Sequence, residues 1–265
     1  VPFNFVVSIC SICSSSLGKK YLMALSGFIL VGFVFVHMAG NLQMFAGAEA
    51  INTYAYQLKA LPWFVLWGSR LFLLVAVVVH AWTAAKICAE NRASRPTKND
   101  VEVTKKSGWA SLNMGLTGSI LFAFIVFHIL HFTTQTVFPE YKELTTHVPA
   151  SDGAEVHDVY LMVLSSFGVE WLSAVYVLCM FLLCRHLTHG VSSMFQSLGL
   201  RRESWRSKLD SLATLYGWVI FFGFISIPLA VILQKHGAVE VFDKVAFDQV
   251  VPAAVSSSIP EAPTQ

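Results

Sequence analysis

Five long apolar segments constrain this chain more than any other feature of its sequence. They cover residues 21–45, 64–88, 109–138, 168–194 and 212–233. A helix needs about 20 consecutive apolar residues to cross a bilayer, and several of the segments reach that length. None shows the alternation of apolar and polar residues that is typical of a barrel strand. The sequence therefore predicts an all-α membrane protein, a bundle of five transmembrane helices.

Composition agrees with this interpretation. Only 13% of the residues are charged and the mean hydropathy is +0.61, whereas an average soluble domain carries about 25% charged residues. The net charge is +2, and no basic stripe is interleaved with aromatic residues, so nucleic acid is not an expected partner. A shorter apolar stretch at 159–167 predicts an interfacial helix before the fourth span.

The distribution of lysine and arginine predicts the orientation, because cytoplasmic loops carry an excess of both. If the N-terminus lies inside, most of the 18 basic residues fall on the inner side. The inner set is Lys19, Lys20, Lys86, Arg92, Arg95, Lys98, Lys105, Lys106, Arg185, Arg201, Arg202, Arg206 and Lys208. We therefore expect a cytoplasmic N-terminus and an outer C-terminus. The predicted parts are a cytoplasmic segment 1–20, a membrane domain 21–235, and an outer tail 236–265 that is partly disordered.

Four of the five apolar segments each contain a histidine with apolar neighbours: His37, His80, His128 and His186. Ionisable groups at membrane depth are costly, and by default they indicate a function. One buried histidine is readily explained by packing. Four, on four different spans, favour a shared role.

The depth of each histidine divides the four into two pairs. At a rise of about 1.5 Å per residue, His37 lies roughly 24 Å from the start of its span. His128 is similarly deep in the third span, whereas His80 and His186 lie in the inner half of descending spans. The sequence thus predicts an outer pair, His37 with His128, and an inner pair, His80 with His186. Two imidazoles at one depth on facing helices suit the ligation of a haem iron from both faces, which favours electron transfer.

Other histidines and several glycines bear on these predicted sites. His131 and His189 each follow a proposed ligand by three residues on nearly the same helix face, so spacing alone leaves the choice within each pair open. The remaining histidines, His147, His157 and His236, are predicted to be solvated. Glycines near the proposed ligands would leave room for the edges of a haem, although glycine also promotes close helix packing. They are Gly32, Gly40, Gly118 and Gly190.

Specific stretches of the chain carry a family resemblance. These are GAEAINTYAYQLKALPW at 47–63, HMAGNL from His37, HAWTAAK from His80, HILHFTTQ from His128 and HLTHGVSSMFQSLG from His186. Through the end of the fifth span, the chain resembles the single-subunit, two-haem cytochrome b anchors of succinate:quinone oxidoreductases. Both the Bacillus-type succinate dehydrogenase anchors and the epsilonproteobacterial fumarate reductase anchors are similar.

This resemblance implies a function, its cofactors and its partners. The chain would be a multi-pass subunit in a bacterial cytoplasmic membrane, holding two haems b. It would pass electrons between an iron–sulfur subunit, itself served by a flavoprotein, and a membrane quinone that is expected to be menaquinone. The dehydrogenation itself would take place on the flavoprotein. The haem of the inner pair would lie nearer the soluble subunits.

The resemblance also implies roles for individual residues. It assigns the ligands to His128 and His186 and makes His131 and His189 their neighbours. Glu170, with the adjacent Trp171, matches an acid–aromatic pair at the outer start of the fourth helix, and we expect it to serve quinone or proton exchange. Cys184 departs from the family, because the reductases carry a glutamate there that is implicated in proton movement.

Two other functions are alternatives. The cytochrome b subunits of nitrate reductases, hydrogenases and formate dehydrogenases also use membrane histidine pairs, but the loop at 47–63 argues against them. A proton-coupled transporter or receptor could use intramembrane histidines as relays. It would need no haem, so the colour of the purified protein separates it from a cytochrome.

Overall fold

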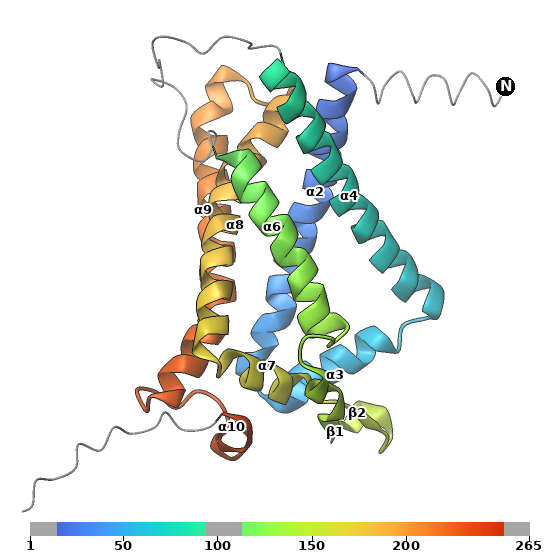
Figure 1. The fold of residues 1–265 in the computed structure, drawn as a ribbon, viewed down its shortest axis with the longest axis vertical. Coiled ribbons are helices and arrows are strands. Elements are labelled where there is room, and N and C mark those ends of the chain that lie inside the picture. Colours follow the sequence, from blue (N-terminus) through green and yellow to red (C-terminus); the bar gives the residue numbers. More distant parts are fainter. Residues whose placement is uncertain (1–14, 94–112, 252–265) are drawn as a thin grey trace, which may run out of the picture.

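The computed structural model describes residues 15–93 and 113–251. Within these residues, five helical segments are long and apolar enough to cross a membrane, and successive ones run in opposite directions (Figure 1). The helices are α2 (Ser16–Asn41), α4 (Trp63–Ala93), α6 (Met114–His128), α8 (Glu170–Ser197) and α9 (Glu203–Lys235). The predicted class, an all-α membrane bundle with five candidate spans, is confirmed. Orientation in the membrane stays a prediction.

The helix ends differ from the ends of the apolar segments. Helix α2 begins at Ser16, before residue 21, because the Ser15 side chain accepts a hydrogen bond from the Gly18 amide at 2.9 Å and caps the first turn. Helix α9 begins at Glu203 rather than near residue 212, since its first turns carry charged residues that continue the helix beyond its apolar part. Hydropathy finds the apolar part of a helix and misses such extensions.

The third span also ends earlier than predicted. Helix α6 passes into a π-helical turn, η2 (Ile129–Thr133), and Gln135 then has a φ of 53°. This left-handed backbone conformation terminates the helix. The sequence predicted a helix through residue 138, but residues 134–138 are not helical. The predicted start of this span, at residue 109, lies outside the described residues.

Short elements gather at one end of the bundle, at the bottom of Figure 1. They are η1 (Leu42–Ala46), α3 (Ala48–Lys59), η3 (Pro139–Glu143), β1 (Thr145–His147), η4 (Pro149–Ser151), β2 (Glu155–His157), α7 (Val159–Phe167) and α10 (Lys244–Val250). Strands β1 and β2 form an antiparallel hairpin in which Thr146 pairs with Val156. We call these elements the cap and the opposite end of the bundle the far end. Helix α7 has the bounds predicted for the interfacial helix.

A buried polar link joins α3 to α7. The Asn52 side-chain amide donates to Asp158 Oδ1 at 3.0 Å, and Asn52 Oδ1 accepts from the Tyr160 amide at 3.0 Å. Asp158 also caps α7 by accepting from the Leu161 amide at 2.9 Å. Buried polar groups generally need such partners. The segment 47–63 is therefore mainly a helix fastened to the cap, rather than an irregular loop.

The main apolar core lies where the cap meets α8 and α9. Buried side chains from α7, α8, α9 and the C-terminal segment form one cluster there, including Leu164, Leu172, Val231 and Phe247. Part of the predicted outer tail thus belongs to the cap, because α10 packs on α7. Residues 252–265, where disorder was predicted, lie outside the described residues.

Glycines allow α9 to approach its neighbours closely. A Cβ added at Gly217 would lie 2.8 Å from Thr188 Oγ1 on α8, and one at Gly223 would lie 2.1 Å from Met38 Sδ on α2. Small residues at helix crossings are typical of membrane bundles. Helix α4, by contrast, packs mainly on α2, and its cap-side end leans away from the bundle (Figure 1).

Tryptophans project from both ends of the helices. Trp63 on α4 and Trp171 on α8 are 76% and 61% exposed near the cap, and Trp205 on α9 is 59% exposed at the far end. Tryptophan is enriched at both interfaces of a membrane. Together with the many exposed apolar side chains between them, these residues fit a multi-pass membrane protein.

Candidate functional site

The four intramembrane histidines meet in two pairs, each formed between different helices. The rings of His37 on α2 and His128 on α6 have centroids 5.8 Å apart, nearly perpendicular at 82°. The rings of His80 on α4 and His186 on α8 have centroids 6.3 Å apart, at 67°. The structure thus brings together the same residues that the depth argument paired. We call them the cap pair (His37 and His128) and the far pair (His80 and His186).

The spacing within each pair fits a metal ion between the rings. A bond from a transition metal to an imidazole nitrogen is about 2 Å long, so two imidazoles on opposite faces of one iron have ring centroids roughly 6 Å apart. Both pairs match this separation. Within the described residues, no group of three or more histidine, cysteine or acidic side chains could hold a metal ion, and a haem with two axial protein ligands needs only a pair.

Three of the four histidines turn Nδ1 toward the protein. His80 Nδ1 donates to the Met23 carbonyl at 3.2 Å, with Ser26 Oγ at 3.4 Å. His186 Nδ1 faces Thr117 Oγ1 at 3.5 Å, and His128 Nδ1 faces the Tyr176 hydroxyl at 3.5 Å. Ligating histidines usually donate their second N–H in this way, which fixes the tautomer and the ring orientation. The arrangement leaves Nε2 of each ring for a metal.

His37 differs from the other three. Its Nε2 lies 3.4 Å from the Asn41 side-chain amide, which also donates to the His37 carbonyl at 2.7 Å. Its ring stacks on Phe33, with centroids 5.3 Å apart. Asn41 would therefore have to release Nε2 for that nitrogen to bind a metal, while keeping its bond to the carbonyl.

The two neighbouring histidines are engaged elsewhere. His131 is fully buried, with Nδ1 at 2.8 Å from the Tyr176 hydroxyl and Nε2 at 3.2 Å from Ser166 Oγ. Both of its nitrogens therefore have protein partners. His189 Nε2 lies 3.2 Å from Ser193 Oγ, one turn along the same helix. This geometry favours His128 and His186 as the metal-binding members.

Two glycines contact the far pair directly. A Cβ at Gly27 would lie 3.3 Å from His80 Cε1, and one at Gly118 would lie 3.6 Å from His186 Cε1. Gly118 was among the glycines expected to line a haem. Gly40 instead makes room for Tyr54, with its Cβ position 2.8 Å from the hydroxyl, whereas added Cβ atoms at Gly32 and Gly190 would meet open space.

Glu170 lies at the start of α8, apart from both pairs. Its carboxylate is 3.3 Å from Lys235 Nζ and 3.3 Å from His236 Nε2, and its side chain is 58% exposed. Lys235 also donates to the Gly168 carbonyl at 2.9 Å, so the group ties the start of α8 to the end of α9. Tyr176, which faces His128, lies six residues further along α8, or roughly 9 Å along the helix axis. A role for Glu170 in quinone or proton exchange stays a prediction.

Cys184, at the position where the reductases that the chain resembles carry a glutamate, is fully buried where α8 meets α9. Its Sγ would lie 3.5 Å from a Cβ at Gly217. A glutamate side chain would need space that α9 occupies. The local packing therefore suits the small side chain that this sequence has.

The far end carries paired charges. Lys19 on α2 is buried and forms an ion pair with Glu90 on α4. Asp210 accepts two hydrogen bonds from Arg201, each 2.7 Å, and one from Ser192 at 2.5 Å. These pairs tie α2 to α4 and α8 to α9 at that end of the bundle.

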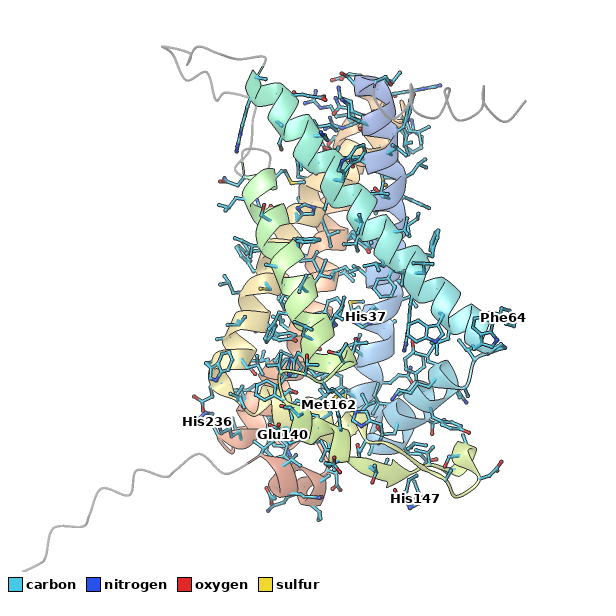
Figure 2. The ribbon with its side chains drawn as sticks, turned by 45° about the vertical axis from the view of Figure 1, so that its right-hand side comes forward. His37, Phe64, Glu140, His147, Met162 and His236 are labelled. Carbon is cyan, nitrogen blue, oxygen red and sulfur yellow. The ribbon has the colours of Figure 1, made fainter. Side chains whose placement is uncertain are left out.

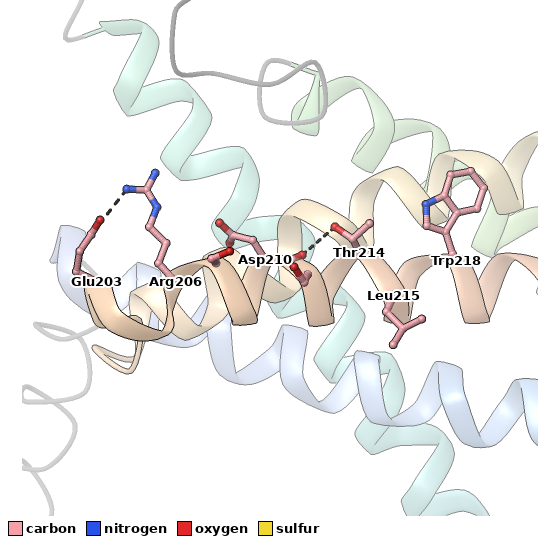
Figure 3. A pocket seen from close by; sticks show the side chains of 8 residues that line it. Glu203, Arg206, Asp210, Thr214, Leu215 and Trp218 are labelled. Carbon is pink, nitrogen blue, oxygen red and sulfur yellow. Dashed lines mark hydrogen bonds and ion pairs between the residues drawn. The ribbon is translucent and has the colours of Figure 1, made fainter.

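A surface groove of about 740 Å³ lies on α9 (Figure 3). It runs from Glu203 and Arg206 at the far end to Trp218. None of the paired histidines lines it. The groove is therefore separate from the candidate site.

His157, one of the two cap histidines that the sequence placed among solvated residues, is instead held by the protein. His157 is half-buried, donates from Nδ1 to the Leu144 carbonyl at 3.0 Å and accepts from Gln135 Nε2 at 2.7 Å. Burial, together with the charge of Lys59, lowers the pKa of His157, although the Leu144 carbonyl and Asp158 oppose the shift. His147 and His236 are exposed or near the surface (Figure 2).

Sequence reasoning missed Tyr176, Ser166 and Gly27, which contact the histidines from other helices. Tyr176 lies within an apolar span, where a tyrosine hydroxyl needs a hydrogen-bond partner. That requirement was the one available signal. Ser166 and Gly27 carry no mark in the sequence that distinguishes them from packing residues.

No protein-family model matches the chain, no curated protein is significantly similar to it, and no solved structure matches it significantly.

Proposed function

We propose that this chain is a cytochrome b that holds two haems between its membrane helices. The observation that carries the proposal is the pairing of four histidines at two levels, with ring centroids 5.8 and 6.3 Å apart. A transporter that used histidines as proton relays would not need two pairs that each match the span of one iron. Bound haem would supply reversible one-electron transfer.

The protein's own residues would hold and orient these groups. Met23 and Thr117 would fix the ring nitrogens of the far pair, and Tyr176 would fix His128 in the cap pair. Ligands that already have hydrogen-bonded partners need little rearrangement on binding. The surrounding helices would keep water away from the haem edges.

We further propose that the chain is the membrane anchor of a succinate dehydrogenase or fumarate reductase. The support is the resemblance of its histidine motifs and of the segment 47–63 to the two-haem anchors of that family. The chain would work with a flavoprotein and an iron–sulfur subunit and would exchange electrons with a membrane quinone, menaquinone by the same resemblance. The basic residues near the far end favour placing that end in the cytoplasm of a bacterial cell.

A haem assay tests the first part of the proposal. The chain is purified from membranes and its haem is measured as the pyridine haemochrome. We expect two haems b per chain. One haem or none would overturn the two-site proposal.

Isolation of the native complex tests the second part. We expect a flavoprotein and an iron–sulfur protein to purify with the chain, and the complex to reduce a dye with succinate. A partner that instead oxidised formate or hydrogen, or reduced nitrate, would leave the cytochrome proposal standing and replace the family.

A further inference from the structure

A buried chain of hydrogen bonds runs from the cap pair into the cap. It links His128 and His131 on the third span, Tyr176 on α8 and Ser166 on α7. His131 and Ser166 are fully buried, and Tyr176 is 6% exposed. The metal-binding role proposed above does not explain this series of hydrogen bonds.

The donor and acceptor of each hydrogen bond follow from the Met162 carbonyl at one end of the series, because a carbonyl can only accept. Ser166 Oγ lies 2.7 Å from the Met162 carbonyl, which can only accept, so the serine hydroxyl donates there. Its lone pairs then accept from His131 Nε2–H at 3.2 Å. Because His131 lies among aromatic rings, it is neutral and has one N–H, so its Nδ1 accepts.

The remaining two bonds follow in turn. The Tyr176 hydroxyl donates to His131 Nδ1 at 2.8 Å, and its oxygen is left to accept from His128 Nδ1–H. His128 Nε2 then carries no proton and has a lone pair for a metal. The chain of bonds therefore selects His128 rather than His131 as the ligand and sets its tautomer.

We infer that Tyr176 is a positioning residue that tunes the haem of the cap pair through His128. The inference rests on the proposed function. A hydroxyl that accepts from Nδ1–H makes the imidazole a stronger electron donor through Nε2, which stabilises the oxidised iron and lowers the reduction potential. His131 strengthens the effect, because hydrogen bonds in a chain polarise one another.

The far pair has a shorter arrangement. His186 Nδ1 faces Thr117, whose hydroxyl also donates to the Asn113 carbonyl at 3.0 Å, and His80 Nδ1 donates directly to the Met23 carbonyl. Neither contact continues into a second histidine within the described residues. The hydrogen bonds through Tyr176 and His131 thus belong to the cap pair alone, so changing them should affect one haem.

The test is the potential of each haem in Tyr176→Phe, with Tyr216→Phe as the matched control. Phenylalanine keeps the ring contacts of Tyr176 with Phe124 and Phe167 and removes only the hydroxyl. The partly buried hydroxyl of Tyr216 also donates, to the Val31 carbonyl at 2.6 Å, but contacts no histidine nitrogen in the part of the chain that the structure describes. The haem of the cap pair is identified as the component lost in His37→Ala.

In Tyr176→Phe we expect the equilibrium of the cap-pair haem to shift about tenfold toward the reduced form, or about 59 mV for one electron. The far-pair haem, and both haems in Tyr216→Phe, should keep their potentials. An unchanged cap-pair potential in a variant that binds both haems would overturn the inference and leave the cytochrome proposal intact. Absence of haem from the unmodified chain would overturn both.

A second pair of variants covers the case in which Tyr176→Phe loses the haem. His131→Asn keeps an acceptor near the position of Nδ1, whereas His131→Leu removes it. We expect the asparagine variant to retain the original potential and the leucine variant to shift in the same direction as Tyr176→Phe, by less. Equal potentials in the two variants would show that His131 only fills space.

Discussion

The cap pair and the far pair have the same chemistry in different surroundings. His128 lies beside Phe124, Phe132 and Tyr176, close to the main apolar core and to a buried hydrogen-bond chain. His80 lies on α4, the least enclosed helix, and is fixed by a backbone carbonyl of α2. The difference teaches that two haem sites with the same ligands would be tuned separately, the cap site by a network of side chains and the far site by Thr117 and a backbone carbonyl.

The sharpest way to break this comparison is to remove one histidine at a time. His37→Ala and His128→Ala should each abolish one haem, and His80→Ala and His186→Ala should each abolish the other. A missing axial ligand cannot be supplied by the apolar neighbours. Redox-monitored spectra of the four variants provide the measurement, and His147→Ala, at the exposed hairpin, is the control that keeps both haems. Loss of the same redox component from His37→Ala and His80→Ala would refute the pairing.

The close approach of α2 and α9 offers a more local test. In Gly223→Ala the new methyl group would overlap Met38, which adjoins His37, and such overpacking costs about 1–3 kcal/mol. We expect a lower melting temperature and a disturbed spectrum for the cap-pair haem, with the far-pair spectrum unchanged. Gly32→Ala on α2 is the matched control, because its Cβ would meet nothing within 4 Å. Equal effects on both haems would show that the two sites are mechanically coupled.

Quinone exchange gives a third contrast between the ends. Glu170→Gln removes a charge near the cap, and Glu203→Gln removes a comparable acid from the first turn of α9 at the far end. If quinone is served near the cap, succinate–quinone turnover should fall about tenfold in Glu170→Gln alone, equivalent to about 1.4 kcal/mol of barrier. Both haems and succinate–dye activity should survive in each variant. Normal quinone turnover in Glu170→Gln would leave this residue its ion pairs with Lys235 and His236 as its sole role.

The smallest expected effect concerns pH and the cap. Because burial lowers the pKa of His157 below its usual 6.5, the unfolded chain binds more protons than the folded one between the lowered value and 6.5. Stability of the cap should therefore fall as the pH drops through that window, when protonated Nε2 can no longer accept from Gln135. Hydrogen exchange of amides in 129–136 measures this, and far-end amides provide the internal reference. His157→Gln should remove the pH dependence, and its persistence would assign the effect to another group.

Hydropathy and depth predicted much of this arrangement, for an identifiable reason. A span has a fixed direction and rise, so the position of His80 within its segment already indicates its level relative to His186. The same reasoning could not predict the Tyr176–His131–Ser166 chain. His131 is 35 residues from Ser166 and 45 residues from Tyr176 in the sequence. Their contact depends on how α7 is placed relative to α8 and the third span.

The residues at which helices begin and end were less predictable than the depths of the histidines within them. Nothing in HILHFTTQ indicates locally the π-helical turn at 129–133 or the left-handed Gln135, whose side chain is hydrogen-bonded to His157 and Met162 of the cap. Similarly, α9 extends to Glu203 because charged residues can remain helical outside an apolar environment. Helix propensity acts there, and hydropathy does not detect it.

The limited packing of α4 against the rest of the bundle has a consequence for biogenesis. This helix is held mainly by α2 and by the Lys19–Glu90 ion pair, while the ring of its His80 lies beside that of His186 on α8. A haem inserted at the far pair would act as a crosslink between these helices, and a cofactor that binds only the folded chain stabilises it. Newly inserted chains lacking that haem would present a poorly fastened helix to membrane proteases. Haem insertion at the far pair would then serve as the checkpoint at which cellular quality control distinguishes finished subunits from unfinished ones.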